Sequence, residues 1–148
     1  MTILKMNQNH IQQLVTIWLS GSKEAHSFIP FEYWEQRAND MADVYLPQSE
    51  TYVISVENEV VGFISLVEDY LAAIFVVGHV QGQGFGKRLL QHAQSLRNSL
   101  QLKVYEKNSG AISFYQANGF QVIDNILDEE TNERELVMMW HSSSNSID

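Results

Sequence analysis

The chain of 148 residues has no cysteine, only two prolines and no long apolar run. Without cysteine there can be no disulfide, no thiol nucleophile and no cysteine-ligated metal. No apolar stretch approaches the roughly 20 residues that span a bilayer, and the first residues lack the basic and apolar regions of a signal peptide. We therefore expect a cytoplasmic protein that does not contact a membrane.

Basic residues are also scarce, with 9 Lys and Arg against 18 Asp and Glu and a net charge of −9. This balance argues against nucleic acid as a partner, because no broad basic surface is available. The histidines show no metal-ligand spacing, so no metal site is expected.

The scarce positive charge is concentrated, since five of the nine basic residues lie between positions 87 and 107. Acidic residues gather further along the chain. They are Asp124, Asp128, Glu129, Glu130, Glu133 and Glu135. This separation suits an anionic ligand on one side and a cationic acceptor on the other, although ordinary solvated charges would give the same pattern.

Apolar periodicity and turn residues predict an α+β protein with a mixed sheet. The first helix is expected to begin near Asn7 or Asn9 and end at Gly21, and the second to begin near Pro30 and end at Pro47. The second would carry Trp34, Ala38, Met41 and Tyr45 on one face. Two later helices are expected. One follows Gly86, and the other spans residues 109–118. The expected strands are 51–56, 60–67, 71–77, 100–105, 120–126 and 135–140, which gives the order ααβββ-α-β-α-ββ. We expect one domain over residues 1–140 and a frayed tail over 141–148.

Three glycines at alternate positions, Gly82, Gly84 and Gly86, connect the apolar strand at 71–77 to an amphipathic helix. Glycine permits positive φ and close approach of the backbone, and a helix N-terminus attracts anions. A P-loop would require Ser or Thr after Lys87, where Arg88 stands, and the glycine spacing differs from the dinucleotide-binding G-x-G-x-x-G. The segment is therefore predicted to bind the phosphates of a nucleotide or of coenzyme A (CoA).

Two segments together resemble the GCN5-related N-acetyltransferases (GNAT). Residues 81–86, Gln-Gly-Gln-Gly-Phe-Gly, match the family signature Gln/Arg-x-x-Gly-x-Gly/Ala. Residues 108–120, Asn-Ser-Gly-Ala-Ile-Ser-Phe-Tyr-Gln-Ala-Asn-Gly-Phe, resemble the family's second CoA-contacting element. The resemblance extends over about residues 1–140. It looks closest to small bacterial enzymes, including those that act on protein amines.

The resemblance implies a mostly antiparallel sheet that splays where acetyl-CoA binds, and direct transfer of acetyl to an amine. Tyr115 would be the general acid that protonates the departing thiolate. Asn108 would contact the pantetheine or, alternatively, cap the helix that follows it. The full set of expected cosubstrate-binding residues is Phe75, Val76, Val77, Gln81, Gly82, Gln83, Gly84, Phe85, Gly86, Lys87, Asn108 and Tyr115.

The general base is left open by the sequence. Some relatives use a glutamate at the position of Lys103, which cannot accept a proton while it is charged. The candidates are Glu68, Glu106 and His26, and a water relay is an equal alternative.

The acceptor is also left open. Tyr70, His26 and Phe28 are the expected substrate-binding residues, and the acceptor is a protein amine (a lysine or the N-terminus). A small amine such as a polyamine, amino acid or aminoglycoside is the alternative, and a non-catalytic CoA-binding sensor is an alternative of another class. The protein is expected to be a monomer or a homodimer, in which Trp140 could pair across the interface.

Overall fold

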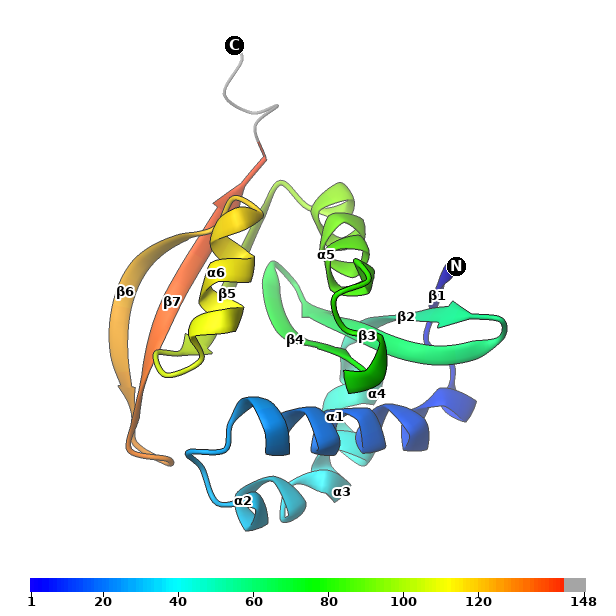
Figure 1. Cartoon of the computed structure of the whole chain (residues 1–148), viewed down its shortest axis with the longest axis horizontal. Helices are drawn as coiled ribbons and strands as arrows, with labels where there is room; N and C mark the ends of the chain where they lie inside the picture. The colour runs from blue at the N-terminus through cyan, green and yellow to red at the C-terminus, as the bar shows by residue number, and fades with distance from the viewer. Residues whose placement is uncertain (143–148) are drawn as a thin grey trace.

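The computed structural model describes residues 1–142 and contains one seven-stranded sheet with helices on both faces (Figure 1). The strands are β1 Thr2–Lys5, β2 Glu50–Val56, β3 Glu59–Val67, β4 Tyr70–Val76, β5 Ser99–Tyr105, β6 Gln121–Asp128 and β7 Glu133–His141. Their order across the sheet is β1-β2-β3-β4-β5-β7-β6, and only the β4–β5 pair is parallel. The predicted α+β class with a mixed, mostly antiparallel sheet is confirmed.

The alternation of side chains along β2 and β3 divides the core into two layers. Val53 and Phe63 pack with α1 (Ile11–Ala25) and α2 (Phe31–Glu35) on one face. Ile54 and Ile64 pack on the other face with α5 (Phe85–Leu96), and α6 (Ser109–Ala117) lies on that same face (Figure 1). The mixed sheet therefore has both faces covered, which explains the nearly continuous burial of β3.

The first strand was not predicted from the sequence. β1 pairs with β2 in antiparallel register, with Ile3 opposite Ile54. Four residues of which three are exposed are too few to display a period of two.

Helix α1 continues for four residues past Gly21, so the predicted end at Gly21 is wrong. A Cβ placed at Gly21 would lie 2.4 Å from Cδ1 of Phe75 in β4. The glycine is therefore needed inside the helix, because α1 crosses the ring of Phe75 without room for a side chain.

The predicted second helix is wrong as a continuous element. It is divided into α2, α3 (Ala38–Asp40), a π-helical turn η2 (Met41–Tyr45) and α4 (Leu46–Gln48). Pro47 lies in the first turn of α4 and does not end the segment. Since proline cannot donate a backbone hydrogen bond, the preceding turn is irregular, and Tyr45 is 57% exposed instead of sharing the buried face of Trp34.

The other predicted elements are present, with ends that agree with those expected or differ by one or two residues. Glu57 and Asn58 have φ of 54° and 67° in the predicted β2–β3 turn, and Gly119 ends α6 with φ of 94°. Strand β7 includes His141, which was expected to begin the frayed tail. Residues 143–148 of that tail lie outside the described residues. No helix within residues 1–142 has the length and apolar character needed to cross a membrane.

Strands β4 and β5 share one residue pair, Tyr70 with Gln101, and then diverge. One further backbone bond, from the Gln101 N–H to the Asp69 carbonyl at 2.9 Å, supports this end. The sheet is therefore interrupted at its centre. Beyond this pair, the side chains and backbone groups of both strands face a gap.

Candidate functional site

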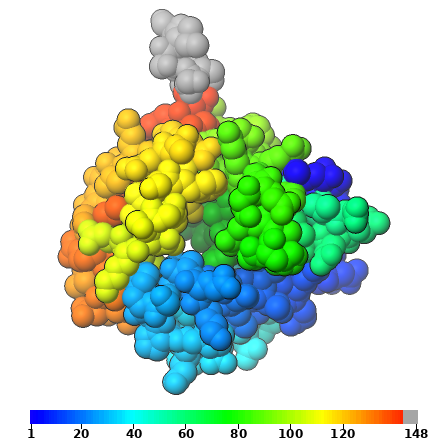
Figure 2. Space-filling model, in the orientation of Figure 1, coloured from blue at the N-terminus to red at the C-terminus, as the bar shows by residue number. Residues whose placement is uncertain are grey.

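A cavity of about 950 Å³ occupies the gap between β4 and β5. Its walls include residues 70–76 of β4, 102–105 of β5, the C-terminal end of α1, the glycine loop and α6. Figure 2 shows its opening between the surfaces of α1, α5 and α6. The structure thus places this cavity where the sheet was predicted to splay.

Strand β4 has a bulge beside the cavity. Leu71 pairs with Leu66 and Ala73 pairs with Ser65, so Ala72 is an extra residue on β4. Phe75 and Val76 line the cavity as expected. Val77 does not: it lines a smaller neighbouring hollow of about 140 Å³, and its N–H already donates to the Val61 carbonyl at 2.8 Å.

The glycine loop has the conformation that its sequence predicts. Gly82 and Gly84 have φ of 84° and 87°, which disfavours any residue with a Cβ. The side-chain amide of Gln81 donates to the Val76 carbonyl at 3.0 Å and ties the loop to β4. Six of the seven expected residues of this loop line the cavity, and only Gln83 lies outside it.

Helix α5 begins directly after Gly84. Its first bond of the helical pattern runs from the Arg88 N–H to the Gly84 carbonyl at 3.0 Å. The preceding N–H groups of Phe85, Gly86 and Lys87 thus belong to the first turn, where a helix offers unpaired donors to an anion. The Phe85 side chain is buried in the core, so only its backbone is available for that purpose.

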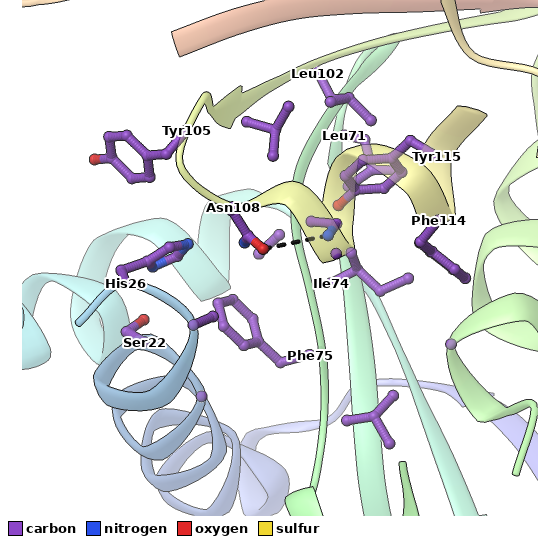
Figure 3. Close-up of a pocket in the computed structure, with 18 of the residues that line it drawn as sticks. Ser22, His26, Leu71, Ile74, Phe75, Leu102, Tyr105, Asn108, Phe114 and Tyr115 are labelled. Atoms are coloured by element: carbon purple, nitrogen blue, oxygen red, sulfur yellow. Dashed lines mark hydrogen bonds between the residues drawn. The ribbon is translucent and has the colours of Figure 1, made fainter. Parts of the chain in front are cut away.

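Asn108 caps α6 and also lines the cavity. Its side-chain oxygen accepts a hydrogen bond from the Ala111 N–H at 3.2 Å (Figure 3). The capping alternative therefore holds in the structure, and the Asn108 side-chain NH₂ is left to donate elsewhere.

Tyr115 projects from α6 toward the cavity, with Leu71 and Ile74 of β4 nearby (Figure 3). The residue is 8% exposed, and burial raises the pKa of its phenol well above the ordinary value. No residue in the described part of the chain shares a hydrogen bond with its hydroxyl. A protonated phenol without a fixed partner can donate its proton to a bound group.

His26 and Tyr70 line the cavity, whereas Phe28 does not. Phe28 stacks its ring edge-to-face against Tyr105, with ring centroids 5.4 Å apart, and so supports the wall from behind. Burial lowers the pKa of His26 to about 4, and its Nδ1 is buried with no partner among residues 1–142. His26 is thus a neutral imidazole at pH 7 and a weak base.

Two further base candidates do not reach the cavity. Glu68 lies in the β3–β4 turn with φ of 53°, and its carbonyl accepts a bond from Arg97 at 3.0 Å. The Glu106 carboxylate accepts a bond from the side chain of Asn125 at 2.8 Å. Glu68 therefore does not lie beside the splay as expected, because the turn that holds it is next to the end where Tyr70 and Gln101 still pair β4 with β5.

Sequence reasoning missed several lining residues with polar side chains, among them Lys103, Tyr105 and Glu135. Tyr105 of β5 and Glu135 of β7 are opposite each other in register. Lys103 shares their face because it lies two residues before Tyr105. The signal that could have identified them is the alternation of side chains along the two strands. It becomes informative only when the register between the strands is known.

The β6–β7 turn lies close to Tyr105 of the cavity wall without lining the cavity itself. Tyr105 donates to Asp128 at 3.3 Å, and Arg37 of the α2–α3 connection pairs with Glu130. These contacts hold the acidic turn close to the α1–α2 region, as Figure 1 also shows.

Comparison with known proteins identifies the family of the chain. Residues 47–122 match the acetyltransferase (GNAT) domain. The chain is 33% identical over 139 residues to the peptidyl-lysine N-acetyltransferase YiaC of Escherichia coli (strain K12), covering 93% of this chain and 95% of that protein.

A second similar protein is known in three dimensions. The solution structure of apo-form YjaB from Escherichia coli superposes with a TM-score of 0.83 at 27% identity, covering 94% of this chain and 96% of that one. The YjaB of Salmonella typhimurium, also named a peptidyl-lysine N-acetyltransferase, is 33% identical over 112 residues, or 75% of this chain and 77% of that protein.

A sheet opened between two parallel strands, with a glycine loop and helix N-terminus at the gap, defines an acyltransferase that delivers acetyl to an amine. The chain belongs to the GCN5-related N-acetyltransferase family.

Proposed function

We propose that the protein transfers the acetyl group of acetyl-CoA to the ε-amine of a lysine in a protein or peptide. The observation that carries this proposal is one cavity that is lined both by the glycine loop and by the Glu135 carboxylate. The similarity to two proteins named peptidyl-lysine N-acetyltransferases supports lysine as the acceptor.

The residues present fit acetyl-CoA. The N–H groups of the first turn of α5, with Gly82, Gly84 and Lys87 beside them, would hold the pyrophosphate. The free edge of β4 around the Ala72 bulge would pair with the pantetheine arm as an added strand does. The Asn108 side-chain amide, whose oxygen is already engaged, would donate to that arm.

Tyr115 would serve as the general acid. Its raised pKa keeps the phenol protonated at neutral pH, which suits donation to a departing thiolate. Tyr70 and His26 would line the path of the acceptor as neutral groups.

The test is an assay of thiol release from acetyl-CoA. The acceptors are a peptide with a free lysine and a blocked N-terminus, a peptide with a free N-terminus and no lysine, and spermidine. Because the chain has no cysteine, the protein itself contributes no thiol signal. Release with the lysine peptide above the acceptor-free rate is expected.

Each other outcome names an alternative. Release only with the N-terminal amine or with spermidine would replace the lysine proposal, and binding of acetyl-CoA without release from any acceptor would favour a CoA-binding sensor. The cytoplasmic location and the monomer or homodimer state stay predictions.

A further inference from the structure

Glu135 differs from the other carboxylates around the site. Within residues 1–142 it is the only Asp or Glu side chain that lines the cavity. Its position on β7, opposite Tyr105 of β5, turns it to the face that carries Lys103. The cavity therefore has one anionic side chain at the end opposite the glycine loop.

The neighbouring carboxylates are already engaged. Asp128 accepts from Tyr105 and Thr131, Glu130 pairs with Arg37, and Glu133 pairs with Lys107 at 3.1 Å. By contrast, no side chain or backbone donor in the described part of the chain hydrogen-bonds or ion-pairs with the Glu135 carboxylate. A half-buried carboxylate without a hydrogen-bond donor is poorly stabilised, so a cationic ligand bound beside it would stabilise its negative charge.

The groups that face Glu135 come from three strands. They are Tyr70 of β4, Lys103 and Tyr105 of β5, and Asp128 of β6, with the His26 ring packed behind Tyr105. Burial and the Asp128 carboxylate raise the pKa of Glu135, and the Lys103 ammonium opposes the rise. A carboxylate with a raised pKa is a better proton acceptor than an ordinary one.

We propose that Glu135 binds the ammonium group of the acceptor in the cavity and takes the proton that must leave before the amine can attack. This inference rests on the proposed function, since it assigns the missing base of that same reaction. It also gives the acceptor end of the cavity its preference for a cation.

The proton balance is complete with two residues. The acceptor ammonium gives one proton to the Glu135 carboxylate, and the lone pair of the resulting amine forms the new C–N bond at the thioester carbonyl. The C–S bond breaks, and the leaving sulfur takes the phenolic proton of Tyr115. The second amine proton returns to the Tyr115 oxygen, so that one proton remains on Glu135 and passes to solvent. The products are the amide and the free thiol.

Glu135→Gln tests the assignment because it keeps the shape and removes the charge and the basic oxygen. We expect kcat/KM for the lysine peptide at pH 7 to fall by about 10²-fold or more, the usual contribution of a general base. Glu133→Gln is the matched control on the same strand: it removes a carboxylate that is paired with Lys107 outside the cavity. It should retain at least half of the wild-type rate, and both variants should bind acetyl-CoA with unchanged affinity.

Two readouts separate proton transfer from a structural role. The deficit of Glu135→Gln should shrink as pH rises toward the acceptor's own pKa, since more amine arrives unprotonated. It should nearly vanish for trifluoroethylamine, an acceptor that is unprotonated at pH 7. A loss that is equal for both acceptors and constant with pH would overturn the proposal.

The failure of this inference can be told from the failure of the proposed function. If wild type acetylates the lysine peptide and Glu135→Gln does so within twofold of the same rate, Glu135 is not the base and the transferase function stands. If wild type acetylates none of the cationic acceptors, the proposed function is wrong and the role of Glu135 is wrong with it.

Discussion

At the scale of single residues, the site relies on groups whose protonation is fixed by burial. The Tyr115 phenol is kept protonated, the His26 imidazole is kept neutral, and the Glu135 carboxyl is shifted toward proton uptake. The proposed donor and acceptor of protons, Tyr115 and Glu135, therefore come from different elements, α6 and β7.

Tyr115→Phe removes only the hydroxyl that points into the cavity. Because the departing thiolate then lacks its proton donor, kcat should fall by roughly 10²–10⁴ while the affinity for acetyl-CoA stays nearly constant. Single-turnover kinetics and calorimetric titration measure the two effects. Tyr45→Phe, in an exposed side chain outside the cavity, is the control and should behave as wild type. Unchanged turnover in Tyr115→Phe would remove this residue from the mechanism.

At the scale of elements, the glycine loop and α5 act as one unit, because Gly84 is both the last loop residue and the N-cap of the helix. Apart from its neighbours in the chain, no atom of residues 1–142 lies within 4 Å of a Cβ placed at Gly84. Packing within the protein therefore does not require glycine at this position. The two remaining reasons are its φ of 87° and the close approach of a ligand to its backbone.

Two substitutions separate these two reasons. Asn adopts the left-handed conformation more readily than other residues with a side chain, so Gly84→Asn should melt within a few degrees of wild type. It should nonetheless bind acetyl-CoA at least about 10-fold more weakly, since its side chain occupies the approach to the first turn of α5. Gly84→Val should lose both stability and binding. Thermal melts and calorimetric titration give the answer, and wild-type affinity in Gly84→Asn would mean that the phosphates do not approach this loop.

The same two elements show what a sequence can predict. The glycine loop and the Asn108-to-Phe120 segment are local, and their backbone geometry follows from which residues they contain. The continuation of α1 through Gly21 depends on the ring of Phe75, 54 positions further along the chain. The irregular segment from α2 to α4 likewise reflects packing against the sheet and Pro47, which no helical period displays.

The candidate site was predictable to a similar degree. Tyr115, Asn108 and most of the loop line the cavity because they follow motifs. Glu135 could not be selected among six acidic residues of its region, since only the β5–β7 register distinguishes it from Glu133. Glu68 looked suitable by its distance along the chain from β4, but it lies in a turn next to the paired end of β4 and β5 and does not line the cavity.

At the scale of the whole molecule, pH should affect stability through His26. Its pKa is about 4 in the folded protein and about 6.5 in an unfolded chain. The unfolded state therefore binds the proton first as pH falls, and stability decreases between pH 6.5 and pH 4.

The predicted size of this effect can be measured by urea unfolding at pH 7 and pH 5. Wild type should lose on the order of 2 kcal/mol more than His26→Phe, in which a ring of similar size remains among Phe28, Trp34 and Tyr105. The raised pKa of Glu135 changes the stability with pH in the opposite direction. This contribution is the same in both proteins, so it cancels in the difference between them. An equal loss in the two proteins would show that another group causes the decrease.

The single residue pair between β4 and β5 divides the sheet into a four-stranded and a three-stranded block that share one pivot. A pantetheine arm lying between them would act as a temporary eighth strand that braces the two blocks. Binding of the cosubstrate would then also stabilise the folded protein, by the usual linkage of binding to stability. The loaded molecule would withstand heat and proteases better than the empty one, and each release of product would return it to its more yielding form.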